Sequence, residues 1–107
     1  MSDAPKAEPD AAVVTDLDRV IHEPARLLVV ALLAVVESAD MLFVHRQTGL
    51  TLGNLSSHVG KLETAGYVEV EKTFVGKKPR TMLCLTDRGR EALDAYRRSM
   101  QSVLDKL

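Results

Sequence analysis

The sequence predicts a mainly α-helical fold that carries a two-stranded β-hairpin. Two short segments with apolar residues at helical spacing follow one another across Gly49. After Gly66 the spacing changes to alternation, which is typical of strands. The helical spacing returns in a longer segment over residues 87–106. The expected order is a helix-turn-helix, a hairpin and a C-terminal helix, preceded by further helical sequence.

Length and composition restrict the class of protein. A chain of 107 residues fits one domain with a thin core, which oligomerisation would help to stabilise. Hydrophobic residues make up 46% of the chain and there is no Trp, so the core should be aliphatic. The single cysteine, Cys84, excludes an internal disulfide and suits a reducing compartment, so we expect a cytoplasmic protein.

The N-terminal part divides into a tail and the start of the domain. Residues 1–12 contain two of the four prolines and have no apolar period, which predicts a flexible tail. The domain should then cover residues 13–107. A short helix, with Asp16 as its N-cap, is predicted from three apolar residues at helical spacing: Leu17, Val20 and Ile21.

The next segment is the most apolar of the chain. Pro24 suits the first turn of a helix, where its missing N–H costs nothing. Residues 25–36 are apolar almost all round, so a helix here must be covered on more than one side. The run from Leu27 to Val36 has ten residues, about half of a membrane span. We therefore expect a buried helix and no membrane partner, and the N-terminus lacks the pattern of a signal peptide.

Capping residues outline the helix-turn-helix. Asp40 can cap a helix over residues 41–48. Leu42 and Phe43 should face the core, and Val44 is a third candidate for this face. Gly49 suits the left-handed residue that ends this helix.

Thr51 can cap a second helix over residues 52–65, which Gly66 would end. The hairpin follows: Val68 and Val70 alternate with polar residues, residues 74–80 should form a turn, and residues 82–85 alternate again. Thr86 can cap the last helix, from Asp87 to about Lys106.

The helix over residues 52–65 has two different faces. Leu52, Leu55, Val59 and Leu62 form one apolar stripe. The opposite face is small and polar, which would let the helix sit deep in the major groove of DNA. An ordinary solvated face is the alternative, but such faces are usually rich in Glu and Lys. The helix alone leaves both interpretations open. The residues of the polar face are Gly53, Asn54, Ser57, Gly60, Lys61 and Thr64.

The hairpin carries a concentration of positive charge, although the chain as a whole has a net charge of −1. Lys77, Lys78 and Arg80 surround Pro79 with no acid between them. Such a tip can neutralise phosphates or place an arginine in the minor groove. A charged loop that only aids solubility is the alternative, but this tip directly follows a helix-turn-helix. The order of elements then predicts a winged helix-turn-helix with flanking N- and C-terminal helices.

Residues 53–93 resemble compact prokaryotic winged helix regulators related to the MarR and ArsR groups. The matching pieces are Gly53-Asn54-Leu55-Ser56 at the helix start, Leu62-Glu63 and Ala65-Gly66-Tyr67-Val68 at its exit, the Lys-Pro-Arg wing, and Leu85-Thr86 before a helix that contains Gly89. Gly60 departs from the pattern, because a long polar or basic residue is expected there.

The resemblance implies a sequence-specific regulator that binds double-stranded DNA as a homodimer at a roughly palindromic operator. Thr51 would hold a phosphate at the start of the recognition helix. The other residues implied to contact DNA are Asn54, Ser56, Ser57, His58 and Lys61 in the major groove and Lys77, Lys78 and Arg80 in the wing.

The last helix offers a dimerisation seam. Five apolar residues recur at spacings of 3, 4, 3 and 4, the pattern by which helices pack along each other. The alternative is that this helix folds back onto Leu17, Val20 and Ile21 of its own chain. The five residues are Leu93, Tyr96, Met100, Val103 and Leu107.

Other functions find little support in the sequence. There is no phosphate-binding loop, zinc-protease motif or nucleophile elbow, so we expect no enzyme and no cofactor. The three histidines share no ligand spacing, so no metal site is expected. Cys84 is more simply a small strand residue than a redox sensor. A winged helix that docks proteins instead of DNA is the main alternative, and whether a small-molecule effector binds is left open.

Overall fold

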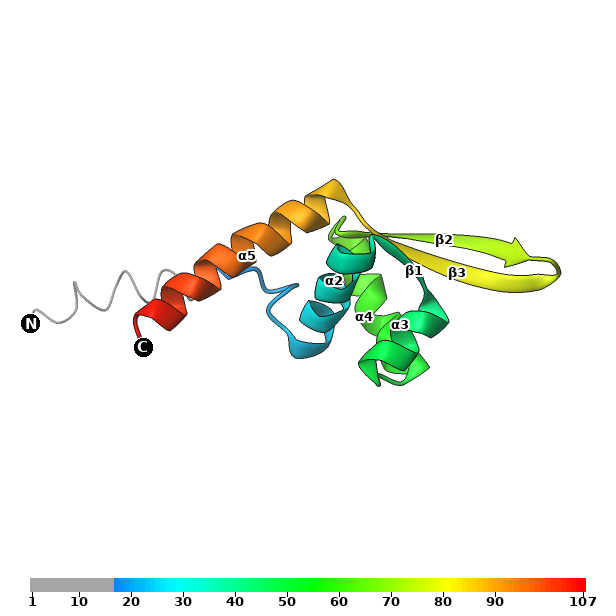
Figure 1. The fold of residues 1–107 in the computed structure, drawn as a ribbon, viewed down its shortest axis with the longest axis horizontal. Coiled ribbons are helices and arrows are strands. Elements are labelled where there is room, and N and C mark those ends of the chain that lie inside the picture. The colour runs from blue at the N-terminus through cyan, green and yellow to red at the C-terminus, as the bar shows by residue number, and fades with distance from the viewer. Residues whose placement is uncertain (1–16) are drawn as a thin grey trace, which may run out of the picture.

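The computed structural model describes residues 17–107 (Figure 1), so the expected tail over residues 1–12 and the Asp16 cap lie outside the described part. A three-stranded antiparallel sheet of order β1-β3-β2 adjoins a helical body, and this body lies between the far end of the sheet and the long last helix. The elements are α2 (Pro24–Val36), β1 (Ser38–Asp40), α3 (Met41–Thr48), α4 (Leu52–Thr64), β2 (Val68–Val75), β3 (Lys78–Leu85) and α5 (Asp87–Asp105).

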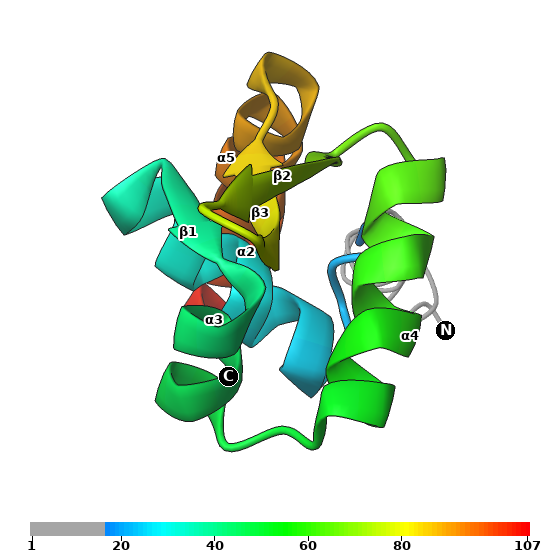
Figure 2. The same cartoon turned by 90° about the vertical axis from the view of Figure 1, so that its right-hand side faces the viewer.

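The helices gather on one side of the sheet. Viewed from the tip of the hairpin, α4 lies to one side and α3 to the other, with α2 behind them (Figure 2). The β2–β3 hairpin projects from this body in one direction and α5 in the opposite direction (Figure 1). The fold thus separates an extended wing from an extended C-terminal helix.

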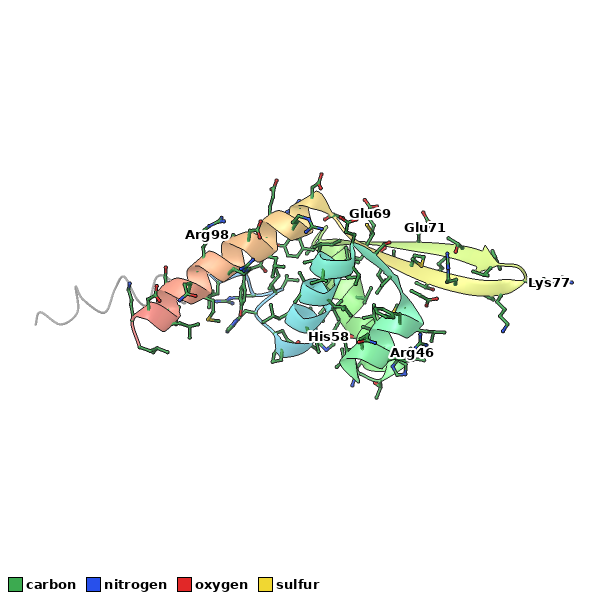
Figure 3. The ribbon with its side chains drawn as sticks, in the orientation of Figure 1. Arg46, His58, Glu69, Glu71, Lys77 and Arg98 are labelled. Carbon is green, nitrogen blue, oxygen red and sulfur yellow. The ribbon has the colours of Figure 1, made fainter. Side chains whose placement is uncertain are left out.

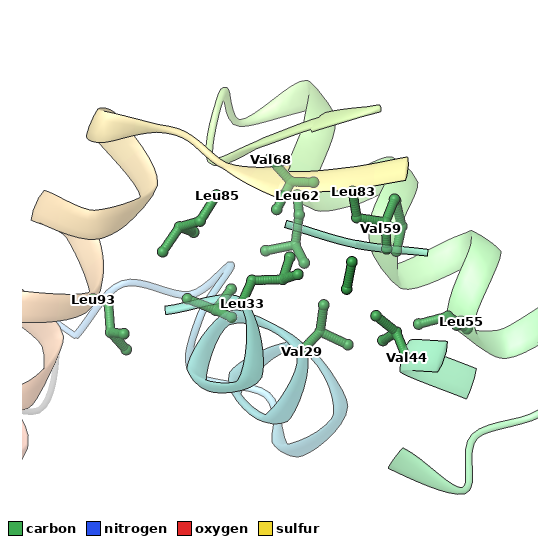
Figure 4. Packing of buried hydrophobic residues seen from close by; sticks show 12 residues of the cluster. Val29, Leu33, Val44, Leu55, Val59, Leu62, Val68, Leu83, Leu85 and Leu93 are labelled. Carbon is green, nitrogen blue, oxygen red and sulfur yellow. The ribbon is translucent and has the colours of Figure 1, made fainter. Parts of the chain in front are cut away.

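The core is almost entirely aliphatic, as the composition predicted. It joins α2, α3 and α4 to the root of the sheet and to the first half of α5 (Figure 4). Its buried side chains include Val29, Leu33, Val44, Leu55, Val59, Leu62, Val68, Leu83, Leu85 and Leu93. A second cluster sets Tyr96 of α5 against Leu17 and Ile21.

The predicted helix caps are confirmed. The side-chain oxygens of Asp40 and Thr51 accept hydrogen bonds from the backbone N–H groups of Leu42, at 2.8 Å, and Asn54, at 3.1 Å. Gly49 ends α3 in the left-handed conformation, with φ of 74°. These caps fix the tight turn between the two helices of the helix-turn-helix.

The prediction of a short helix around residues 17–21 is wrong. Residues 17–23 form turns, because Asp18 Oδ1 accepts hydrogen bonds from the N–H groups of Val20, at 2.8 Å, and Ile21, at 3.2 Å. A short acidic side chain can satisfy the backbone in this way and so competes with helix formation. Leu17 and Ile21 are nevertheless buried, against α5.

Two apolar residues expected to face inward are instead half exposed. Leu42 and Leu52 lie in the first turns of α3 and α4, at the edge of the body, and Val44 is the fully buried residue of α3. The phase of an eight-residue helix is difficult to predict when its first four residues are all apolar.

The sheet differs from the predicted hairpin in two ways. A third strand, β1, pairs Ala39 with Leu83, but three residues are too few to give a pattern in the sequence. The expected turn over residues 74–80 is only two residues long, because β2 continues to Val75 and β3 starts at Lys78. Gly76, with φ of 62°, holds the first central position of this turn, where a tight hairpin favours glycine.

The exit of α4, the root of the wing and the start of α5 meet at one junction. The Thr86 hydroxyl donates to the Gly66 carbonyl, at 2.6 Å, and accepts from the Gly89 N–H, at 2.9 Å. The Thr86 N–H donates to the Tyr67 carbonyl, at 3.0 Å. A Cβ on Gly89 would lie 2.2 Å from that carbonyl oxygen, so only glycine fits here.

We predict opposite effects of the same substitution at two helical glycines. Gly89→Ala should destabilise the fold by about 3 kcal/mol, because the methyl group meets backbone that cannot move freely. Gly60→Ala should stabilise it by about 0.5–1 kcal/mol, because an added Cβ meets no atom within 4 Å and alanine is the better helix former. Urea unfolding measures both, and a Gly89→Ala variant at least as stable as wild type would contradict the tight junction.

The Tyr67 hydroxyl donates a hydrogen bond to Asp18 Oδ2 and so ties the N-terminal turn to the junction. Burial, and then this hydrogen bond, raise the pKa of Tyr67 to about 12. Because that value exceeds the ordinary pKa of about 10, the stabilisation is complete below pH 10 and declines as the pH rises toward 12.

Tyr67→Phe should therefore be less stable than wild type at pH 7 and lose less further stability between pH 10 and pH 12. Burial also raises the pKa of Tyr96, so some alkaline loss should remain. Urea midpoints at pH 7, 10 and 11 test this. Equal alkaline losses in the two proteins would show that the Tyr67 proton is not held by the fold.

Candidate nucleic-acid interface

The outward face of α4 consists of short polar residues. Asn54, Ser57 and Lys61 are exposed on it, together with Ser56 at one side, and no hydrogen bond within residues 17–107 engages these side chains. Thr64 differs, since its hydroxyl donates to the Gly60 carbonyl at 3.0 Å. The face therefore presents donors and acceptors that the fold itself does not use.

The start of α4 is also accessible. Thr51 is exposed and its hydroxyl oxygen caps the helix by accepting from the Asn54 N–H. An added Cβ at Gly53 or Gly60 would meet no other atom within 4 Å, so internal packing does not require these glycines. Because glycine has no side chain, Gly53 and Gly60 leave the outer surface of α4 close to its backbone at these two positions.

His58 lies at the edge of this face. It is half buried and directed toward the start of α2: its Nδ1 lies 3.2 Å from Arg26 Nη1 and its Nε2 3.7 Å from Glu23 Oε2 (Figure 3). Because arginine can only donate, Nδ1 accepts and the proton sits on Nε2, toward the carboxylate. The structure thus uses His58 to hold α4 against α2, one helical turn from Asn54 and Lys61 along the same side of α4.

Glu23 and Arg26 complete this contact. Glu23 caps α2 by accepting from the Arg26 N–H, at 3.0 Å, and this bond lowers the pKa of Glu23, aided by the charge of Arg26. The Arg26 guanidinium also donates to the carbonyls of Val20, at 2.5 Å, and Arg19, at 3.4 Å. α4 is therefore braced by polar contacts as well as by its apolar stripe.

A basic depression of about 680 Å³ flanks α4 on the side of the N-terminal turn. Three cations line it and no acid does. Arg19 and Arg26 were not predicted from the sequence, because they lie more than 25 residues before α4 in the chain and only the fold brings them beside it. The lining residues are Arg19, Val20, Arg26, Ser57, Gly60, Lys61, Thr64 and Ala65.

The wing carries a second group of cations. Lys77 lies at its tip (Figure 3), and Lys78 and Arg80 follow on β3. All three are exposed, and within the described residues no carboxylate lies in salt-bridge range of them. Glu69 and Glu71 lie near the root of the wing. Positive charge is thus concentrated at the far end of the hairpin.

The expected dimerisation seam is divided by the structure. Leu93 is part of the chain's own core, and Tyr96 packs on Leu17 and Ile21, with its hydroxyl 2.8 Å from His22 Nδ1. Met100 packs against the same cluster. The alternative that α5 folds back onto the N-terminal segment of its own chain thus accounts for Tyr96 and Met100, and the main core accounts for Leu93.

Apolar side chains remain uncovered elsewhere on both long helices. Toward the end of α5, Val103 is half buried, Leu104 is half exposed and Leu107 is 95% exposed. On α2, Leu28 is half exposed and Val35 is 81% exposed. The pattern agrees with the expectation that the all-round apolar helix needs covering on more than one side.

Comparison with known families identifies this architecture. A family model described as a winged helix DNA-binding domain matches residues 25–104. The chain belongs to that family. An uncharacterized protein of Methanocaldococcus jannaschii, MJ0432, is 31% identical to it over 78 residues, which cover 73% of this chain and 85% of that protein.

Solved structures share the whole fold. A transcriptional regulator homologue from Pyrococcus horikoshii is 28% identical, with a TM-score of 0.82 over 92% of this chain and 96% of that one. A MarR-family regulator from Silicibacter pomeroyi is 17% identical, with a TM-score of 0.65 over 97% and 69% of the two chains. The predicted winged helix is confirmed, with one strand more than expected, and its fold is similar to that of the MarR-family regulator.

The fold accounts for the positions of two other chemically reactive residues, His45 and Cys84. His45 Nδ1 lies 2.6 Å from the Leu50 carbonyl, so it serves the turn of the helix-turn-helix. Among residues 17–107 no three potential metal ligands lie together, and no helix there is long and apolar enough to cross a membrane. Cys84 is exposed, because Leu83 and Leu85 occupy the core face of β3 and the residue between them faces outward.

Proposed function

We propose that this protein is a transcription regulator that binds double-stranded DNA as a homodimer, with α4 in the major groove and the wing on the flanking backbone. Membership of the winged helix DNA-binding family supports the class of function. The Pyrococcus horikoshii structure, which is similar over almost its whole length, is described as that of a transcriptional regulator homologue.

One observation carries the proposal: the polar face of α4 has no partner in its own fold and lies between two groups of cations. A helix fits the major groove, which is about 12 Å wide, and the small residues of this face would allow close approach. Asn54 can form two hydrogen bonds with adenine, and serines can bond bases or phosphates. Lys61 and Arg19, beside the helix, and the wing would contact phosphates.

One observation favours an alternative to DNA binding, which is that the wing docks another protein. Phe74 and Val75, near the tip of the wing, are 70% and 55% exposed, so the wing is mixed in character and not purely basic. However, the cations beside them lack acidic partners within the described residues, which suits a polyanion better than an ordinary protein surface. DNA binding therefore remains the function that we propose.

The dimer is proposed from the apolar residues that the chain leaves uncovered. Val103, Leu104 and Leu107 at the end of α5, with Val35 and Leu28 on α2, would be buried against a second copy. A two-fold arrangement would place two recognition helices about 34 Å apart, one turn of DNA, and would match a palindromic operator.

The first prediction from the proposed function tests the wing. Replacing Lys77, Lys78 and Arg80 together by alanine should remove up to three phosphate contacts and reduce the slope of log affinity against log salt by about 2–3. Titration of a random-sequence duplex at several salt concentrations measures this slope. An unchanged slope would refute the role of the wing.

A matched pair of single variants controls for net charge. Lys77 and Arg98 lie at opposite ends of the molecule (Figure 3). Lys77→Ala should lower the slope by about 1, because one phosphate contact is lost. Arg98→Ala removes the same charge from α5 and should leave the slope unchanged. If the two variants behave alike, net charge and not the wing sets the binding.

The second prediction tests base recognition by α4. Asn54→Ala should relax specificity at one base pair of the preferred site and weaken binding there by about 1–3 kcal/mol. Lys61→Ala should weaken specific and random duplexes equally, because Lys61 would contact only the backbone. Competition binding with both duplexes separates the two effects. Equal losses in the Asn54 variant would assign Asn54 to the backbone instead.

The third prediction concerns the dimer. Light scattering of the wild-type protein at micromolar concentration should give twice the monomer mass. Leu104→Glu together with Leu107→Glu should give a folded monomer, because charges would then lie where the second chain packs and both side chains are exposed in the single chain. Truncation after Arg98 should have the same effect. A monomeric wild-type protein would exclude the dimer and the palindromic operator with it.

A further inference from the structure

The wing has two different faces beyond the body of the protein. Strand pairing sets Phe74 opposite Pro79 and Lys72 opposite Thr81 on one face, and Val75 opposite Lys78 and Thr73 opposite Arg80 on the other. Side chains alternate between the two faces of a strand. The first face continues the one on which Val68, Leu83 and Leu85 pack on the helices.

At the far end of the wing this core face is uncovered. β1 pairs with β3 only from Met82 to Cys84, so no third strand extends toward the tip. Phe74 is 70% exposed, and Pro79 beside it is exposed as well. An apolar pair thus lies on the side of the sheet where α4 lies, beyond the reach of the core.

The charged residues near this apolar pair indicate the chemistry of the partner that would fit it. Lys72 lies on the same face as this pair and Lys77 lies in the adjoining turn, while Lys78 and Arg80 lie on the opposite face of the wing. None of these cations has an acidic partner within the described residues. A wing tip that carries an exposed aromatic ring on one face and unpaired cations around it suits a polyanion with an apolar interior. Stacked base pairs between two phosphate backbones have this character.

We infer that Phe74 acts as an apolar wedge, which enters the minor groove next to the major groove bound by α4 and presses on a base step. The inference rests on the proposed function. The minor groove is about 6 Å wide, so only the two-residue tip and one inserted side chain could enter without widening it. Lys77 and Lys78 would hold the phosphates on the two sides of the groove.

The wedge would add sequence preference at a position that no hydrogen bond reads. A side chain pressed into a base step partly unstacks it and bends the duplex toward the major groove. Pyrimidine–purine steps such as TA and CA unstack most easily, so they would be preferred under the wing. The cations alone would show no such preference, because phosphates are the same in every sequence.

The test compares three variants on duplexes that share one preferred major-groove site and differ only in the flanking step, TA against GC. Wild-type protein should bind the TA duplex about tenfold more tightly. It should also bend that duplex by at least roughly 20°, measured by energy transfer between dyes at the two ends.

Phe74→Ala should lose most of this preference and of the bend while keeping the salt slope, because the cations remain. Phe74→Leu, which keeps an apolar wedge, should retain much of both. Val75→Ala, on the opposite face of the same tip, should resemble wild type. Thermal unfolding should be similar for all four proteins, because the Phe74 side chain contributes little to the core.

The outcomes separate the wedge from the proposed function. A Phe74→Ala protein that keeps the step preference and the bend would overturn the wedge, and so would a wild-type protein that binds both duplexes equally and bends neither; the proposed DNA binding would stand in both cases. If wild-type protein binds no duplex above background, the proposed function fails and the wedge fails with it.

Discussion

The close approach of the first turn of α5 to the Tyr67 carbonyl is the constraint on which the rest of this structure depends. Gly89 allows it, because any larger residue would meet backbone at 2.2 Å. Thr86 then bonds to both Gly66 and Gly89 through a single hydroxyl. The end of the recognition helix, the root of the wing and the start of α5 are therefore joined at one point, and their relative positions follow from it.

That junction explains how a thin domain can present two separate surfaces. α4 and the wing leave the junction on one side, and α5 leaves it on the other (Figure 1). The contact of His58 with Arg26 and Glu23 braces α4 a second time, on its side toward α2. A rigid link between these surfaces is what a regulator needs if pairing of two chains is to set the spacing of two recognition helices.

Much of this arrangement could be predicted from local patterns, and the rest could not, for physical reasons. Asp40, Thr51, Thr86 and Gly49 act within a few residues of themselves, so their capping roles follow from the sequence. Asp18 misled the prediction because its side chain replaces helix hydrogen bonds with a turn.

Contacts between distant residues explain the remaining differences. β1 forms only because β3 offers it an edge, and its three residues carry no signal of their own. The contact of His58 with Arg26 depends on α2 lying beside α4, and Arg19 and Arg26 line the depression beside α4 for the same reason. Tyr96 belongs to a regular seam in the sequence, yet the segment before α2 covers it.

The central claim is that α4 reads bases, that the junction fixes its position, and that a dimer presents two copies of it. Selection of bound sequences from random duplex DNA tests this claim most directly. The account predicts enrichment of two inverted half-sites whose centres are about 10 base pairs, or a multiple of one DNA turn, apart. Recovery of sequences with no common motif would contradict base recognition by α4, and recovery of one unrepeated half-site would contradict the paired arrangement.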